Sequence, residues 1–339
     1  MVRNHFCELV NIDVPIVQGA MGGASCPALA AAVAEAGGVG FLAPWTLPAD
    51  ALRQQIRATR ALTQKPFGVN LVLTQPQEER LEICLEEGVP LISFFWAQPG
   101  KLIDVAHRGG AKVFHTVPSA DEAARAVDSG ADVIVAQGWE AGGHVNGTVS
   151  TMALVPMVVD RVGSVPVLAA GGIADGRALA AAMALGASGA WIGTRFLAST
   201  EAAIHPRYRD LLIAAKETDT VYSTLFDVGW PDAPHRCLRN KTIDDWEAAG
   251  RQPTGQRTGE GDVIARFSGK DVVRYQSFTP RAGTEGDVEA MSLWAGQGVG
   301  MLRRLQPAGD IVREIVADAR ATVAKICGPD LLGPAVRRA

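Results

Sequence analysis

The sequence lacks a cluster of basic residues, a long apolar run and any closely spaced pair of cysteines. Its 32 Lys and Arg and 36 Asp and Glu are mixed along the chain and give a formal net charge of −4. Proteins that bind nucleic acid neutralise phosphates with clustered basic side chains, so this pattern argues against nucleic acid as a partner. No stretch predicts a membrane span, and residues 1–8 lack the apolar core of a secretion signal. We therefore expect a protein of the cytoplasm with no membrane partner.

The cysteines are odd in number and far apart. The five are Cys7, Cys26, Cys84, Cys237 and Cys327, and no two form a Cys-x-x-Cys pair. This spacing predicts neither a disulfide framework nor a structural zinc site. No spacing among the histidines and carboxylates is typical of a metal site either. We expect the cysteines to be small buried apolar residues.

The chain does have the composition of a folded globular protein. It holds 339 residues, of which 47% are hydrophobic and 20% are charged. That balance allows a large buried core. The length alone is compatible with two domains or with one α/β barrel that carries insertions.

Short apolar runs alternate with longer Ala- and Leu-rich segments from about residue 14 to residue 194. We predict eight strands, at residues 14–18, 39–43, 67–73, 91–96, 112–117, 133–137, 167–170 and 190–193. The predicted helices between them cover residues 28–36, 49–61, 78–87, 120–128, 152–161 and 176–185. This order favours a (β/α)8 TIM barrel, because closure leaves no sheet edge, and an open parallel sheet is the alternative.

The pattern changes after about residue 216. Residues 221–286 are rich in Pro, Gly, Trp, Arg and Asp, with a short periodic piece at 242–249. Long irregular segments of this kind are often functional lids. We predict a barrel at residues 1–215, an insertion over its catalytic face at 216–286, and a C-terminal part at 287–339 with helices at 287–305 and 311–326.

Glycine clusters follow four of the predicted strands. They lie at residues 18–23, 137–147, 170–173 and 193–194. Chemistry in a TIM barrel sits at the carboxyl ends of the strands, and the loops after strands seven and eight commonly bind phosphate. The last two clusters therefore predict a phosphorylated ligand, although close packing of helices on strands would also explain them.

His144 is the candidate catalytic residue. Its loop also holds Glu140 and Asn146, and together they are the only concentrated polar set at a predicted strand end. An imidazole can transfer protons near neutral pH. His115 lies in the fifth predicted strand, where it could face the ligand or the core, and we favour the core.

The motifs in these loops resemble those of nitronate monooxygenases, formerly called 2-nitropropane dioxygenases. The similar runs are residues 15–23 (PIVQGAMGG), 68–70 (GVN), 135–144 (VAQGWEAGGH), 170–177 (AGGIADGR), 192–196 (IGTRF) and 294–300 (WAGQGVG). The resemblance covers most of residues 10–215. It is weaker at residues 93–99 and 227–231, two segments that we expect to shape the substrate pocket.

The resemblance implies FMN as the cofactor and His144 as the catalytic histidine. By the same resemblance the cofactor-binding residues are Met21, Asn70, Gln137, Gly142, Gly172, Trp191, Ile192, Gly193 and Thr194. The implied reaction oxidises an alkyl nitronate or nitroalkane with O2 to a carbonyl compound and nitrite. His144 would then bind the nitro group or take a proton from the α-carbon.

Three other functions are alternatives, and each explains at least part of these motifs. The nearest is an FMN-dependent enoyl-acyl-carrier-protein reductase or NAD(P)H:quinone reductase, because such enzymes share the Gly-Gly-His loop. A flavin-free lyase or isomerase would explain the phosphate loops but not Asn70 or Gln137. A flavin carrier without catalysis would leave His144 unexplained. The sequence is compatible with a homo-oligomer.

Overall fold

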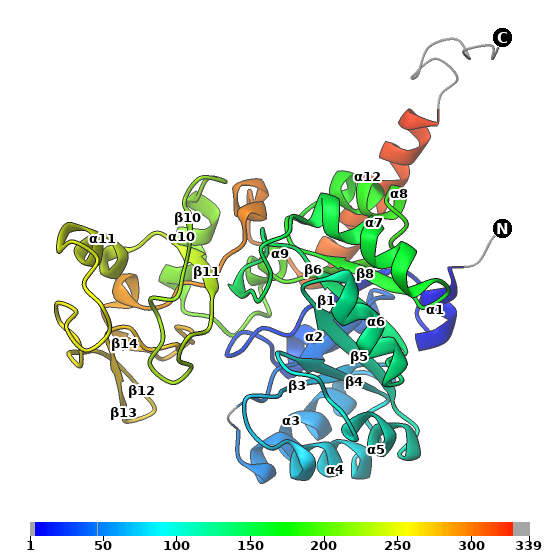
Figure 1. Ribbon diagram of the computed structural model, residues 1–339, viewed down its shortest axis with the longest axis horizontal. Helices are drawn as coiled ribbons and strands as arrows, with labels where there is room; N and C mark the ends of the chain where they lie inside the picture. The colour runs from blue at the N-terminus through cyan, green and yellow to red at the C-terminus, as the bar shows by residue number, and fades with distance from the viewer. Residues whose placement is uncertain (1–3, 46, 328–339) are drawn as a thin grey trace.

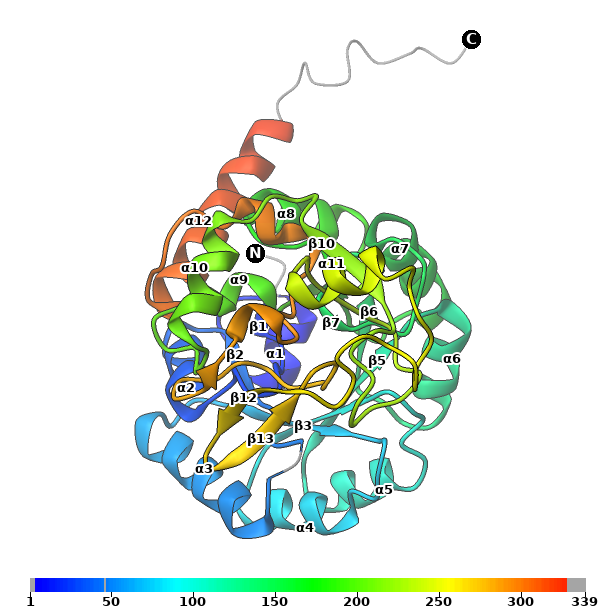
Figure 2. The ribbon, with the colours of Figure 1, turned by 90° about the vertical axis from the view of Figure 1, so that its left-hand side faces the viewer.

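Eight parallel strands form a closed barrel in the computed structural model, which describes residues 4–45 and 47–327 (Figures 1 and 2). Going round the barrel, the strands are β1 (Ile16–Gln18), β2 (Val39–Leu42), β3 (Gly68–Val72), β4 (Leu91–Phe95), β5 (Lys112–Val117), β6 (Val133–Gln137), β8 (Val167–Ala170) and β9 (Gly189–Ile192). Each overlaps a predicted strand, and the closing pair is β1 with β9. The predicted TIM barrel is confirmed.

Helices surround this barrel as its outer layer. They are α2 (Pro27–Glu35), α3 (Ala49–Leu62), α4 (Glu78–Glu86), α5 (Leu102–Arg108), α6 (Ala120–Asp128), α7 (Thr151–Val162) and α8 (Gly176–Ala184). Six of these were predicted, and α5 was missed. It has only seven residues, and its N-cap, Lys101, accepts no hydrogen bond through its side chain. A short helix without a capping side chain gives little local signal.

The amino-terminal end of the barrel is closed by α1 (His5–Val10). Phe6, Cys7 and Val10 of this helix pack with residues that point inward from the strands, among them Phe41 and Phe114. The rings of Phe6 and Phe114 meet edge to face, with centroids 6.1 Å apart. The open end is therefore the opposite one, where the strands end.

The segment after the barrel lies across that open end (Figure 2). It contains α10 (Pro206–Ala214), β10 (Thr220–Ser223), β11 (His235–Leu238), α11 (Lys241–Ala248), β12 (Val263–Phe267), β13 (Lys270–Val273) and β14 (Glu285–Gly286). The strands form two small sheets, in the orders β10-β11-β7 and β13-β12-β14. The short strand β7 (Gly143–His144) comes from the loop after β6, so the first of these sheets joins the segment to His144.

The helix expected at residues 287–305 is wrong. That stretch holds only two 3-10 turns, η1 (Val288–Ala290) and η2 (Gln297–Met301). Its glycines favour irregular backbone, and a Cβ on Gly296 would lie 2.6 Å from the carbonyl oxygen of Glu140. The segment is used for close packing on the loop after β6.

The last predicted helix is confirmed as α12 (Ala308–Ile326), which packs on α8 and α2. Residues 1–3 of the expected barrel and 328–339 of the expected C-terminal part lie outside the described residues. None of the helices described is both long and apolar enough to cross a bilayer.

His115 belongs to the core. It is 1% exposed, and successive residues of a strand face opposite sides, so the adjacent Phe114 points into the barrel while His115 faces the helices. Burial lowers the pKa of His115 to about 4. The imidazole therefore stays neutral in the folded protein at pH values where the unfolded chain takes up a proton.

We expect His115→Gln to make folding less sensitive to acid. Between pH 6.5 and pH 4 the unfolded state binds the extra proton, so the free energy of unfolding falls as the pH falls, by up to about 1.4 kcal/mol per pH unit for one histidine. The variant should lose this contribution to the slope. Urea unfolding between pH 4.5 and 5.5 measures it, and equal slopes for the two proteins would show that His115 is not buried as a neutral group.

Candidate active site

A cavity of about 890 Å³ opens at the carboxyl ends of the barrel strands. Its wall comes from the loops after β1, β3, β6, β8 and β9, together with residues of the segment that crosses the open end. Nine of the ten residues proposed from the sequence line it. They are Met21, Asn70, Gln137, Gly142, His144, Gly172, Trp191, Gly193 and Thr194.

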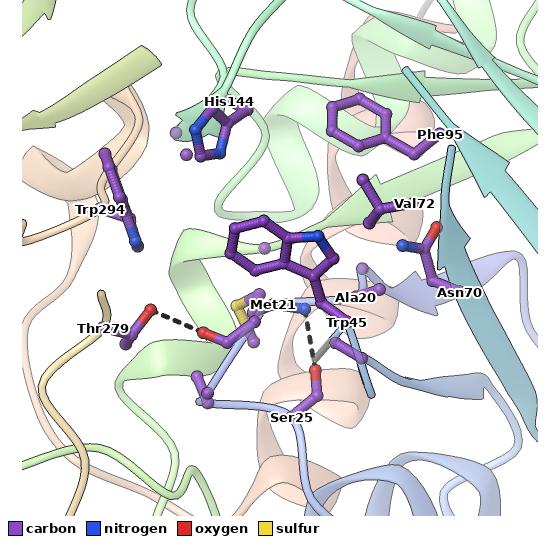
Figure 3. Close-up of a pocket in the computed structure, with 18 of the residues that line it drawn as sticks. Ala20, Met21, Ser25, Trp45, Asn70, Val72, Phe95, His144, Thr279 and Trp294 are labelled. Atoms are coloured by element: carbon purple, nitrogen blue, oxygen red, sulfur yellow. Dashed lines mark hydrogen bonds between the residues drawn. The ribbon is translucent and has the colours of Figure 1, made fainter. Parts of the chain in front are cut away.

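The loop after β1 is held in shape by two buried polar side chains. Gln18 is fully buried, and its amide nitrogen donates to Ser25 Oγ at 2.9 Å, while its Oε1 accepts the Phe41 N–H. Ser25 Oγ also accepts the Met21 N–H at 2.9 Å, as Figure 3 shows. The Met21 N–H is therefore engaged inside its own loop, and the Met21 side chain is the part that faces the cavity and Gly193.

Gln137 positions the loop that carries His144. Its side-chain amide donates to the carbonyl oxygen of His144 at 3.1 Å. The other two polar residues noted in this loop do not join His144. The Glu140 carboxylate accepts the N–H and the hydroxyl of Thr151 at the start of α7, and Asn146 is exposed. Only His144 brings a titratable group from this loop into the cavity.

Aromatic rings surround the His144 imidazole. Trp230 stacks on it, with ring centroids 3.9 Å apart and planes 23° apart. Trp294 and Trp96 lie at centroid distances of 5.3 Å and 5.9 Å. His144 Nε2 is buried and has no hydrogen-bond partner among the described residues. These ring contacts restrain the imidazole. Figure 3 shows His144 and Trp294 beside the cavity.

The surroundings keep His144 neutral. Burial, and to a lesser degree the neighbouring His235, lower the pKa of His144 to about 3. His235 is neutral as well, because burial lowers its pKa to about 4. Its Nε2 accepts the Phe226 N–H, which leaves Nδ1 to donate to the Ala233 carbonyl oxygen. His144 thus enters any reaction as an uncharged imidazole.

The two segments that differ from the family pattern both reach the cavity. Phe95 lines it from the end of β4, and Val228, Gly229, Trp230 and Pro231 line it from the segment over the barrel. Trp96 has a φ of 91°, an uncommon conformation for a residue with a side chain, and it contacts both Trp230 and His144. The sequence suggested these segments for the pocket but did not place any of their rings against His144.

The glycine loops after β8 and β9 form an open cradle. A Cβ on Gly193 would find only the Met21 side chain within 4 Å, at 3.8 Å or more, and a Cβ on Gly172 would come no closer than 3.7 Å to Glu140. Gly172 has a φ of 71°, which favours glycine. Ile192 is the one proposed residue that does not line the cavity. Its side chain packs in the core, and its carbonyl oxygen accepts the Gly19 N–H.

The charge of the cavity was not predicted. Among its described lining residues there is no Asp or Glu, and the only charged side chains are Lys270 and Arg281. Both come from the segment over the barrel, where the sequence mixes acids and bases and gives no sign of which side chains face inward.

A matched pair of glycine variants tests the packing of the His144 loop. Gly142 and Gly22 both line the cavity and both lack a positive φ. A Cβ on Gly142 would lie 2.3 Å from the Gly296 backbone nitrogen, whereas a Cβ on Gly22 would meet nothing within 4 Å. We expect Gly142→Ala to lower the free energy of unfolding by about 1–3 kcal/mol. Gly22→Ala should change it by less than about 0.5 kcal/mol. Urea denaturation compares them, and equal effects would contradict this close contact.

Comparison with known proteins agrees with the geometry. The family model for nitronate monooxygenase matches residues 3–80 and 75–318. A nitronate monooxygenase of Pseudomonas aeruginosa is 32% identical over 94% of this chain and 100% of its own length. A (3aS,4S,5R,7aS)-5-hydroxy-7a-methyl-1-oxo-octahydro-1H-indene-4-carboxyl-CoA dehydrogenase of Rhodococcus jostii is 35% identical over 94% of this chain and 96% of its own.

Solved structures show the same fold. FabK from Thermotoga maritima superposes with a TM-score of 0.83 at 36% identity, over 96% of this chain and 99% of its own. A nitroalkane oxidase from Streptomyces ansochromogenes gives a TM-score of 0.79 at 30% identity, over 95% and 99% of the two chains. With a family model that spans nearly the whole barrel and the segment above it, the chain belongs to the nitronate monooxygenase family and is an oxidoreductase.

Proposed function

We propose that the protein uses FMN and O2 to oxidise alkyl nitronates to a carbonyl compound and nitrite. The observation that carries this proposal is the uncharged His144 at the edge of a cavity whose described wall has no carboxylate. An anionic nitronate meets no like charge there. It already lacks the α-proton, so it does not require a strong base from the protein.

The residues present fit FMN. The open glycine positions at Gly172 and Gly193 leave room for a phosphate that a side chain would fill, and Thr194 begins α9 (Thr194–Leu197) beside them. Asn70, Gln137, Met21, Gly142 and Trp191 would line the ribityl chain and the ring. Ile192 would take part through its backbone only. Bound FMN would supply the electron acceptor for the oxidation.

The protein's own part in the reaction is to orient and shield the substrate. His144 would hold the nitro group through an imidazole N–H, or accept the α-proton of a neutral nitroalkane. The Trp230 and Trp294 rings would exclude water from the reacting carbon. In this proposal residues 1–215 are the barrel, 216–286 the lid, and 287–339 the part that packs on the barrel.

The first test replaces His144. We expect His144→Ala to keep FMN, to lose most turnover of neutral nitroalkanes, and to lose less with preformed nitronates, because only the former need a base. Since burial lowers the pKa of His144 to about 3, the rate of nitronate turnover by the wild type should not change with the titration of a histidine between pH 5 and 8. Oxygen uptake measures the substrate dependence and the pH dependence. Unchanged activity on both substrates, or a change in rate near pH 6.5 that the variant loses, would refute this role.

A second candidate is oxidation or reduction next to the carbonyl of an acyl thioester. The size of the cavity and its two cationic side chains, Lys270 and Arg281, favour a substrate larger than an alkyl nitronate and bearing an anionic group. The Rhodococcus jostii relative, named as a dehydrogenase of a CoA derivative, supports this class. A reductase of this kind would take its electrons from NAD(P)H.

One experiment separates the two candidates. We expect the FMN-loaded protein, mixed without oxygen with NADH or NADPH, to stay yellow over the time in which a nitronate is turned over. Rapid bleaching of the flavin absorbance by either nucleotide would favour the reductase instead. A protein that fails to bind added FMN would contradict both, and would favour the flavin-free lyase or isomerase.

A further inference from the structure

Arg281 is a cation with no counterion among the described residues. Its Nε is buried and has no hydrogen-bond partner among the described residues, and no ion pair joins its guanidinium to a described carboxylate. Burial lowers the pKa of Arg281, with no acidic group to offset it. An unpaired, partly desolvated charge is unfavourable, and its side chain lines the cavity.

Other contacts fix the Arg281 side chain in place. Its guanidinium carbon lies 5.3 Å from the ring centroid of Phe267 and 5.1 Å from that of Phe278. The Phe278 N–H donates to Ser292 Oγ, which donates in turn to the Phe278 carbonyl oxygen. The Arg281 side chain also packs against Gly23, where an added Cβ would lie 2.8 Å from Arg281 Nε. The charge is thus held in one position before any ligand arrives.

Arg257, in the same segment, shows the contrasting case. It is 5% exposed, and its guanidinium binds Asp227 Oδ1 at 2.9 Å and Glu260. Its guanidinium also lies over Tyr275. For Arg257 the segment provides carboxylates, whereas the buried Arg236 donates to the Trp139 carbonyl oxygen and lies over the Trp139 ring. For Arg281 the segment provides two aromatic rings and an open cavity.

Arg281 and the glycine cradle come from different parts of the chain. Two residues before Arg281, Thr279 donates from its hydroxyl to the Gly22 carbonyl oxygen, on the opposite side of Met21 from Asn70 (Figure 3). The cradle belongs to the barrel loops after β8 and β9, whereas Arg281 and Lys270 belong to the segment above them. The cavity is therefore lined by open glycines from the barrel loops and by cationic side chains from the segment above them.

We propose that Arg281, assisted by Lys270, binds the phosphate of a phosphopantetheine thioester that enters the cavity beside the flavin. This inference rests on the second candidate function, and it names the group that anchors the substrate. A guanidinium forms charge-assisted hydrogen bonds with phosphate, and Lys270 adds a mobile charge at the exposed rim. The thioester end would then extend toward His144.

The test compares two ligands with the same acyl thioester. Crotonyl-CoA carries phosphates, and crotonyl-pantetheine carries none. Isothermal titration of the FMN-loaded protein measures binding without turnover. We expect wild type to bind crotonyl-CoA roughly ten- to a hundredfold more tightly, the range for one charge-assisted contact. Arg281→Met keeps an unbranched stem between the phenylalanines and should abolish the difference, and Arg281→Lys should restore part of it.

Arg60→Met is the matched control. Arg60 also lies over a phenylalanine ring, Phe67 at 4.7 Å, and has no carboxylate partner among the described residues, but it is outside the cavity. This variant should keep the preference for crotonyl-CoA. A loss of preference equal to that of Arg281→Met would mean that the effect is not local, and would overturn the proposal.

The remaining outcomes separate the sources of the phosphate. Crotonyl-carrier protein that binds more tightly than crotonyl-CoA, again through Arg281, would identify a protein-borne phosphopantetheine and support the site. Equal binding of both small ligands by wild type would overturn it, as would an Arg281 dependence seen only with NADPH. Loss of FMN from Arg281→Met would assign the arginine to the cofactor instead. These binding measurements do not depend on nitronate turnover. The phosphate site and the nitronate oxidation can therefore be refuted independently of each other.

Discussion

β1 and β9 pair in parallel, with Ile16 beside Ala190 and Gln18 beside Ile192, and this pairing closes the barrel. In an open sheet these two strands would form opposite edges, and the loops that follow them would lie far apart. Closure lets the Gly19 N–H donate to the Ile192 carbonyl oxygen and brings Met21 against Gly193. The cavity exists because loops from both ends of the strand order meet there.

The segment over the barrel completes this cavity through a second pairing. β11 lies antiparallel to β7, which sets His235 beside His144 and brings the neighbouring Trp230 onto the imidazole. The backbone contact and the ring contacts have a chemical consequence, because they bury the histidine and keep it uncharged. The overlying segment and the candidate catalytic residue therefore form one unit, and a movement of one would change the solvation of the other.

The barrel and the overlying segment contribute different chemistry. The barrel loops offer glycines, a few amides and little charge, which suits a cofactor held through backbone groups. The overlying segment brings Trp230, Lys270 and Arg281 into the wall of the same cavity. Within one family such a segment can alter the substrate while the barrel keeps its cofactor, since function depends on the site and not on the fold alone.

Local patterns in the sequence determined the eight strands, most of the helices and the loop that carries His144, and the resemblance to a known family supplied most of the other proposed residues that line the cavity. Apolar periodicity and glycine after a strand are signals that neighbouring residues carry, so the strand that precedes Gly142 could be identified without a structure. The prediction of a helix at residues 287–305 was wrong because the backbone at Gly296 is determined by its close contact with the distant Glu140 and not by local helix propensity. Only the tertiary structure decided that Trp230 covers His144 and that Arg281 faces the cavity with no described carboxylate beside it. The first fact depends on a contact between His144 and the distant Trp230, and the second depends in part on the hydrogen bond from Thr279 to the distant Gly22. Local periodicity in the sequence does not reveal contacts of this kind.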